Sequence, residues 1–312
     1  MKLLEPTFFH INCDYSFGDQ SGYQNGLVSI KDANLSNFEF LNKVDECIKQ
    51  GKKHMTLFID NIRLYKRDGI KYTAGELNNE QLRIYKDKVV ADFFLKNDLL
   101  FLCGQIKNMN FIIYTGFEDT PIDDEIFDKI PENVLKIYAS NAISFGGKVV
   151  PIPYGIKRKL NQFDNNHEIL KQTINVEITP TKLAYLNFSI TNPNRKKIID
   201  SFRNESWVTI EINKLNYSNY LINLKKHKFV FCPDGNAIGC DCHRDWETIY
   251  MKRVPIVLDT SYLREIYKDI PVLFVKDFSE VTEKLLLDNS HLFDEMSNFD
   301  LNNLKYEFIF SN

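Results

Sequence analysis

Short apolar runs alternate with helix-like segments through residues 183–287, and this alternation is the strongest constraint on the fold. The strand candidates are Ala184–Ser189, Trp207–Ile212, Phe229–Cys232, Pro255–Leu258 and Val272–Val275. The segments with helical spacing are Asn194–Phe202, Tyr220–Lys226, Cys242–Met251, Leu263–Tyr267 and Val281–Leu287. A series in which each strand is followed by a helix predicts a doubly wound sheet of parallel strands.

The first half of the chain shows a similar, less regular alternation. Its strand candidates are Thr7–Cys13, His54–Ile59, Phe111–Tyr114, Val134–Ala139 and Lys148–Ile152, and its helix candidates are Asn37–Lys49 and Val89–Lys96. The acidic residues 123–125 are placed to cap a short helix at Ile126–Ile130. The polar stretch between the two halves has no clear strand and predicts a crossing between domains.

We therefore expect an α/β protein with two Rossmann-like domains that face a cleft, built on mainly parallel sheets. The expected N-terminal domain covers residues 1–157, the crossing 158–180 and the C-terminal domain 181–312. The last helix is expected to pack back on the N-terminal domain.

Composition narrows the class of protein. The 312 residues carry a formal net charge of −3, which argues against a nucleic-acid-binding protein. No apolar run approaches the roughly 18–20 residues that span a bilayer, and the N-terminus lacks the apolar stretch of a signal peptide. The expected location is the cytoplasm, with contact to the inner face of a membrane at the protein surface. Nothing in the sequence bears on the oligomeric state.

The segment from Lys228 to Leu258 is the main candidate for a functional site. A strand that is apolar on both faces, Phe229–Cys232, runs into a glycine-bearing loop, Pro233–Gly239, and then into a helix. Such a loop bends tightly and lets a ligand approach the backbone. In parallel sheets ligands bind beyond the carboxyl ends of strands, and a helix that begins there presents free N–H groups to a phosphate.

Two charged residues in this helix suit a nucleotide. The guanidinium of Arg244, in the first turn, has the donor geometry that phosphate oxygens prefer. Glu247 lies three residues later on the same helix face and could accept the hydroxyls of a ribose. The alternative is an exposed i,i+3 ion pair between the two, which would account for neither the loop nor the strand before it.

The cysteines in the same segment raise a zinc alternative. Cys232, Cys240, Cys242 and His243 lie close together in sequence. However, Cys240 and Cys242 are separated by one residue, whereas structural zinc sites usually separate paired cysteines by two to four. We therefore expect no metal site.

Residues 231–250 read Phe-Cys-Pro-Asp-Gly-Asn-Ala-Ile-Gly-Cys-Asp-Cys-His-Arg-Asp-Trp-Glu-Thr-Ile-Tyr, and residues 254–257 read Val-Pro-Ile-Val. Together they resemble the signature of exostosin-like glycosyltransferases. Weaker similarities lie at 185–195, which resembles the start of a donor-binding domain, and at 116–119, 139–141 and 151–156, which resemble acceptor-domain landmarks. One departure is Asn236–Gly239, which replaces the more usual glycine-rich run.

The resemblance implies a two-domain GT-B glycosyltransferase, from the bacterial or viral side of the family, that needs no metal. Its substrates would be a UDP- or GDP-linked sugar and a hydroxyl of a glycan or glycolipid, in surface polysaccharide synthesis. Carried over residue by residue, Arg244 would bind the diphosphate, Glu247 the ribose, and Arg195 would be a second cation near the phosphates. His243 would contact a phosphate or the sugar, or cap the helix. The loop positions expected to touch the donor are Gly235, Asn236 and Gly239.

An inverting enzyme also needs a general base from the facing domain. Glu118 and Asp119 follow the strand Phe111–Tyr114 at its carboxyl end and are the first candidates. The alternatives are His10, in the first predicted strand, Asp14, just after it, and Asp60, at a similar strand end. A retaining enzyme would need no dedicated base, and the sequence does not choose between the two.

Two further classes of protein compete with a transferase. A nucleotide-dependent dehydrogenase would need Gly-x-Gly-x-x-Gly directly after an early strand, and the N-terminal half has none. A non-catalytic nucleotide- or carbohydrate-binding protein stays open as the alternative to a transferase.

Overall fold

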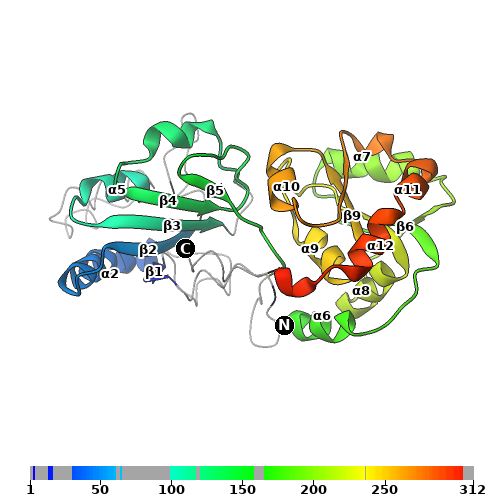
Figure 1. Ribbon diagram of the computed structural model, residues 1–312, viewed down its shortest axis with the longest axis horizontal. Helices are drawn as coiled ribbons and strands as arrows, with labels where there is room; N and C mark the ends of the chain where they lie inside the picture. The colour runs from blue at the N-terminus through cyan, green and yellow to red at the C-terminus, as the bar shows by residue number, and fades with distance from the viewer. Residues whose placement is uncertain are drawn as a thin grey trace. The chain divides into compact units, whose positions relative to one another are not determined.

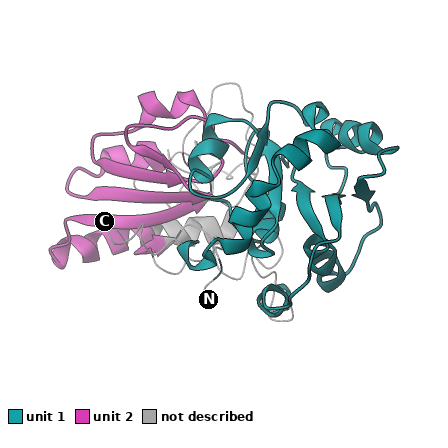
Figure 2. Cartoon of the chain, turned by 45° about the vertical axis from the view of Figure 1, so that its right-hand side comes forward, with its two compact units in different colours: residues 1–5, 153–312 teal, residues 6–152 magenta. Residues whose placement is uncertain are grey.

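The computed structural model describes residues 3, 13–16, 30–60, 64, 99–116, 120–157, 165–235 and 237–304. The chain divides into two compact units, residues 6–152 and residues 1–5 with 153–312 (Figure 2). The division falls at Ile152–Pro153, and residues 165–180 belong to the C-terminal unit. The structure is α/β, and each unit contains a sheet in which every strand pair is parallel, as the alternation predicted.

The N-terminal unit has a five-stranded sheet in the order β1-β2-β3-β4-β5. Its strands are β1 (Tyr15–Ser16), β2 (His54–Asp60), β3 (Asn110–Gly116), β4 (Val134–Ala139) and β5 (Val149–Pro151). Its helices are α2 (Ile30–Lys49), which lies along β2, α5 (Leu99–Gln105) and the 3₁₀ helix η3 (Asp124–Lys129) (Figure 1). The predicted strand at Thr7–Cys13 and helix at Val89–Lys96 lie outside the described residues, except for Cys13.

The short acidic helix forms as predicted. Asp123 is its N-cap residue, and the Asp123 side chain accepts a hydrogen bond of 3.2 Å from the backbone N–H of Glu125. A carboxylate at this position satisfies one of the N–H groups that a helix leaves free at its start.

The C-terminal unit contains a second parallel sheet, in the order β10-β9-β8-β6-β7. Its strands are β6 (Lys182–Leu186), β7 (Val208–Ile210), β8 (His227–Phe231), β9 (Val254–Leu258) and β10 (Leu273–Val275). The connecting helices are α7 (Pro193–Phe202), α8 (Tyr217–Lys225), α9 (His243–Tyr250) and α10 (Ser261–Ile266). Outside this series lie α6 (Asn166–Ile174), η4 (Phe278–Glu280), α11 (Glu283–Asp288), α12 (His291–Asn298) and η5 (Leu301–Asn303).

Burial explains why these segments form strands. In β8, the central strand, Phe229, Val230 and Phe231 are fully buried, and in β9 Ile256 and Val257 are as well. A strand that is covered on both faces reads as a continuous apolar run, which is the pattern the sequence shows. Helix α12 contacts β9 of its own unit, and Lys252 donates to the carbonyl of Ser297 at 2.8 Å. Within the described residues, no helix is long and apolar enough to cross a membrane.

Candidate functional site

The strand order of the C-terminal sheet locates the edge where a ligand would bind. From β6 the chain passes to β7 on one side and then returns to β8 on the other side. The order therefore reverses between β6 and β8. In doubly wound sheets ligands bind at such a reversal, outside the carboxyl ends of the strands. The loops that follow β6, β7 and β8 all begin at this edge.

Arg195 holds two of these loops together. Its three guanidinium nitrogens donate to backbone carbonyls of both loops: Asp234 at 2.9 Å, Ser189 at 3.1 Å and Pro233 at 3.1 Å. Asn192, the N-cap residue of α7, adds a bond of 2.9 Å from its side-chain amide to the carbonyl of Gly235. Arg195 is 6% exposed. Its contacts are those of a clamp between the two loops, whereas the role that the resemblance implied, a second cation near the phosphates, stays a prediction.

The glycine-bearing loop after β8 is held by its own contacts. Gly239 has a φ of 76°, a conformation that L residues other than glycine rarely adopt. Its N–H donates to the carboxylate of Asp234 at 3.0 Å, and its carbonyl accepts from Thr260 at 3.0 Å. Asn236 lies outside the described residues. The positive φ explains why glycine is needed at 239 without any ligand contact.

The amino end of α9 is already faced by a protein carboxylate. Asp245 accepts from the backbone N–H of Cys242, the N-cap residue, at 3.0 Å and from the hydroxyl of Tyr267 at 2.8 Å. Burial raises the pKa of Asp245 to about 7. A carboxylate at this position compensates the partial positive charge of the helix start. Because Asp245 compensates the helix start, the positive charge that α9 can offer to a ligand is that of the Arg244 side chain.

The residues beside Arg244 in sequence tie the start of the C-terminal unit to its sheet. Asp241 is buried and accepts three hydrogen bonds: from the backbone N–H of Tyr154 at 2.7 Å, Trp246 Nε1 at 2.6 Å and the hydroxyl of Tyr262 at 2.8 Å. His243 Nδ1 lies 2.8 Å from the carbonyl of Gly155, and the rings of His243 and Tyr154 are 4.8 Å apart. His243 is thus engaged with residues 154–155 and does not line the cavity described next.

A cavity of about 540 Å³ opens at the carboxyl ends of β6 and β7. Its lining residues come from three segments: Asn187, Phe188 and Ser189 after β6; Ile212 to Tyr217 with Tyr220 after β7 and in α8; and Arg244 of α9. Among the residues that the structure describes, Lys214 and Arg244 line it and no carboxylate does. The cavity therefore favours an anionic ligand with an apolar, planar part.

Arg244 is oriented for such a ligand. Its Nε donates to the carbonyl of Asn187 at 2.8 Å, and its guanidinium lies 5.4 Å from the ring centre of Phe188. Arg195 lies 5.5 Å from the same ring. Within the part of the chain that the structure describes, the two terminal nitrogens of Arg244 have no protein acceptor. One nitrogen fixes the side chain, and the other two remain available to an anion.

Glu247 lies behind the cavity wall. It is 8% exposed and does not line the cavity. Its Oε1 accepts from the hydroxyl of Tyr217 at 2.9 Å, and its Oε2 accepts from that of Tyr220 at 3.0 Å. Burial raises its pKa, while these hydrogen bonds and the charge of Arg244 act against that rise. The exposed Arg244–Glu247 ion pair considered from sequence does not form.

Among the cavity residues that sequence reasoning did not predict are Phe188, Lys214, Tyr217 and Tyr220. A signal was present for the two tyrosines, because an i,i+3 spacing at the start of a helix places both hydroxyls on one face. Phe188 and Lys214 lie in loops, and no local pattern directs their side chains to the cavity.

The clustered cysteine thiols have separate partners. Cys232 contacts the hydroxyl of Thr248 at 3.6 Å, Cys240 the carbonyl of Ile238 at 3.8 Å, and Cys242 the carboxylate of Asp245 at 3.1 Å. Among the described residues, no three or more His, Cys, Asp or Glu side chains lie close enough to hold a metal ion.

The candidate bases of the N-terminal unit are described only in part. Glu118, Asp119 and His10 lie outside the described residues, and β3 ends at Gly116, just before the first two. For Asp60, the last residue of β2, the structure describes the backbone alone.

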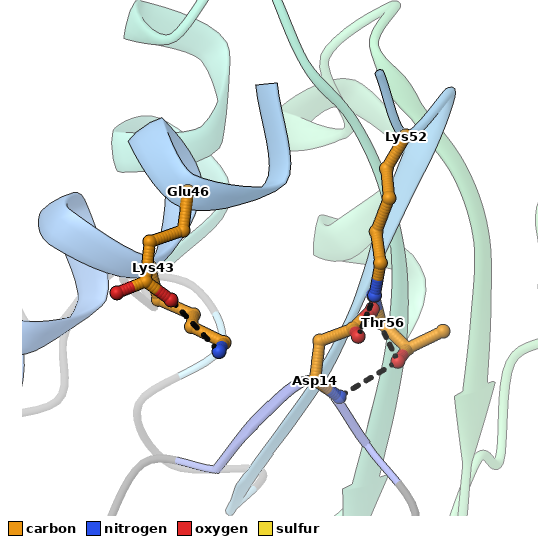
Figure 3. Close-up of polar contacts among 5 residues, drawn as sticks. All are labelled: Asp14, Lys43, Glu46, Lys52 and Thr56. Atoms are coloured by element: carbon orange, nitrogen blue, oxygen red, sulfur yellow. Dashed lines mark hydrogen bonds and ion pairs between the residues drawn. The ribbon is translucent and has the colours of Figure 1, made fainter. Parts of the chain in front are cut away.

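Asp14 is described fully, and its carboxylate is already bound. It accepts hydrogen bonds from the ammonium of Lys52 and from the backbone N–H and hydroxyl of Thr56, the last two at 2.9 and 3.0 Å (Figure 3). Burial acts to raise its pKa, but the bonds from Lys52 and Thr56 lower it on balance. Asp14 precedes β1 rather than following it. A carboxylate with a lowered pKa is a poor proton acceptor, so Asp14 is a weak candidate for the base.

Compared with models of known protein families, the chain matches none, and a search of curated proteins also returns no match. The function proposed below therefore depends on the residues of this chain and on the motif resemblance described above.

Proposed function

We propose that this protein is a glycosyltransferase that transfers a sugar from a UDP- or GDP-linked donor to a hydroxyl of a glycan or glycolipid. The observation that carries the proposal is the cavity at the carboxyl ends of β6 and β7, which among the described residues is lined by Arg244 and Lys214 and by no carboxylate. Two nitrogens of Arg244 are open to an anion there. The resemblance of residues 231–257 to the exostosin-like signature gives this anion an identity, the diphosphate of a nucleotide sugar.

The cavity residues suggest how the donor lies. Phe188 offers aromatic surface to a nucleobase, and Arg244 with Lys214 offers positive charge to the two phosphates. In the transfer step negative charge grows on the departing diphosphate. A guanidinium held in place by Asn187 and Phe188 stabilises that charge without first reorganising, so a metal ion is not required for this task.

The remaining parts of the proposal concern the acceptor. In a GT-B arrangement the two units would face each other across a cleft, and Glu118 or Asp119 would supply the base for an inverting reaction. The sites of action would be the cytoplasm and the inner face of a membrane, in surface polysaccharide synthesis.

Replacement of Arg244 tests the site. Arg244→Ala removes two charge-assisted hydrogen bonds to phosphate, so the affinity for UDP or GDP should fall about 10- to 100-fold. Arg244→Lys keeps the charge but loses the forked geometry, and should give a smaller loss. The control is Arg203→Ala, which removes an exposed arginine paired with Asp200 just after α7. Binding is measured by calorimetry, and folding by thermal unfolding without ligand.

The wild-type protein supplies the outcome that would refute the site. A nucleotide at about a hundred times its Kd should stabilise the fold by about 2.7 kcal/mol. If no UDP- or GDP-linked ligand does so, or if Arg244→Ala binds as the wild type does, the proposed site is wrong. A donor screen by release of free UDP or GDP then separates a transferase from a protein that only binds nucleotides.

A further inference from the structure

The two tyrosines of α8 stand between Glu247 and the cavity. Tyr217 and Tyr220 both line the cavity, whereas Glu247 does not, and each tyrosine hydroxyl occupies one oxygen of its carboxylate. A ligand in the cavity therefore meets the tyrosines first. If Glu247 is to accept a ribose hydroxyl of the proposed donor, as the motif resemblance implies, one of these two hydrogen bonds must be exchanged.

The two tyrosines differ in how readily they can move. Tyr220 is 9% exposed and lies one turn inside α8, with its bond to Glu247 buried. Tyr217 is the first residue of α8, directly after the N-cap residue Asn216, and it is partly exposed. Helix ends open more easily than helix interiors, because fewer hydrogen bonds and packing contacts hold them.

Exchange at Tyr217 leaves the hydrogen bonding of Glu247 complete. The Tyr217 hydroxyl donates to Oε1, and a ribose hydroxyl would donate to the same oxygen. The carboxylate keeps two donors throughout, which matters because a buried acceptor without a partner is unfavourable.

We propose that the Tyr217 hydroxyl occupies the position on Glu247 Oε1 that a ribose hydroxyl takes when a nucleotide binds, and is displaced by it. Tyr220 is a positioning residue that keeps Glu247 in place. This inference rests on the proposed function. In the unliganded protein the Tyr217 side chain therefore covers the carboxylate of Glu247. A donor that carries a ribose with free hydroxyls opens it, and a ligand without those hydroxyls does not.

The test compares UDP with 2′,3′-dideoxy-UDP, or the corresponding GDP pair if GDP is the tighter ligand. In the wild type the ribose hydroxyl replaces an equivalent hydrogen bond, so the preference for the ribonucleotide should be small. In Tyr217→Phe no protein hydrogen bond to Oε1 is lost on binding, so the ribose hydroxyl adds one between protein and ligand. The preference should then rise about 2- to 10-fold, through tighter binding of UDP and unchanged binding of the dideoxy analogue.

Two further variants give the controls. Tyr220→Phe should not raise the preference, because its bond persists in the complex. Adding Glu247→Gln to Tyr217→Phe should cancel the rise, since a neutral amide is a weaker acceptor than a carboxylate. A preference that Tyr217→Phe leaves unchanged, that Tyr220→Phe raises equally, or that survives Glu247→Gln overturns the inference while the proposed function stands. A wild-type protein that binds neither UDP nor GDP overturns both.

Discussion

Replacement of Arg195 decides between two roles for this residue. The motif resemblance implied a cation that binds phosphate, whereas the structure places its guanidinium on three backbone carbonyls of the loops after β6 and β8. Arg195→Leu keeps an apolar stem of similar width beside Phe188 and removes every donor. If Arg195 is a clamp, this variant loses stability, and if Arg195 binds phosphate, the variant loses affinity for the nucleotide.

The expected loss of stability follows from the carbonyls left behind. Pro233 and Asp234 are buried, so their two carbonyls would lose a donor with little access to water, whereas the exposed Ser189 would regain a water molecule. Each unsatisfied buried acceptor costs about 1–3 kcal/mol. Removing the buried charge of Arg195 offsets part of this cost. We expect the free energy of unfolding to fall by about 2–4 kcal/mol.

The assay is urea unfolding followed by tryptophan fluorescence. The only tryptophans, Trp207 and Trp246, both belong to the C-terminal unit, so the signal reports the unit that carries the change. Arg203→Leu is the matched control, because Arg203 follows the same helix, is exposed and pairs only with Asp200 at 3.0 Å. It should change stability by less than about 0.5 kcal/mol. A stable Arg195→Leu protein that no longer binds UDP would refute the clamp and support the phosphate role.

Two more perturbations test the buried acids of the same unit. Asp241→Asn leaves one oxygen for the three donors of Tyr154, Trp246 and Tyr262, and should lower the free energy of unfolding by about 2–4 kcal/mol and change the emission of Trp246; an unchanged unfolding midpoint in urea would contradict the role given to this carboxylate. For Asp245, burial raises the pKa in the folded state to about 7, so the folded state binds this proton more tightly than the unfolded state does. The contribution of Asp245 to the free energy of unfolding therefore falls as pH rises from about 4 to 7. The stability of wild type minus that of Asp245→Asn should therefore decrease across that window, by up to about 1.4 kcal/mol per pH unit, and a difference that is flat or increases with pH would show that Asp245 is ionised throughout.

Much of the local structure was predictable because burial leaves a mark on short segments. Residues 134–139 form β4 as predicted, and Phe229–Phe231 of the predicted strand Phe229–Cys232 lie in β8, the central strand of the sheet. Helix ends were less accurate. Helix α8 begins at Tyr217 rather than Tyr220, because Asn216 caps it by accepting from the N–H of Asn219. That missed turn contains Tyr217, one of the two tyrosines bonded to Glu247.

The site was harder to predict because its contacts join distant parts of the chain. Arg195 and Asp234 are 39 residues apart, and Glu247 and Tyr217 are 30 apart. Nothing near Arg195 in sequence indicates that its donors are used by carbonyls of another loop. Nothing near Arg244 indicates that Asp245, its neighbour, faces the helix start.

The amino-acid sequence by itself determined the α/β class, most elements of the C-terminal sheet and the cation at the start of α9. These depend on periodicity, on chain breakers and on side-chain chemistry, all of which act over a few residues. Only the tertiary structure decided which charged groups remain open to a ligand. Strand order brings three loops to one edge, and there Arg195 and Asp245 are satisfied by the protein while Arg244 is not. The physical reason is that a buried charge must find partners, and those partners are chosen by packing rather than by neighbours in sequence.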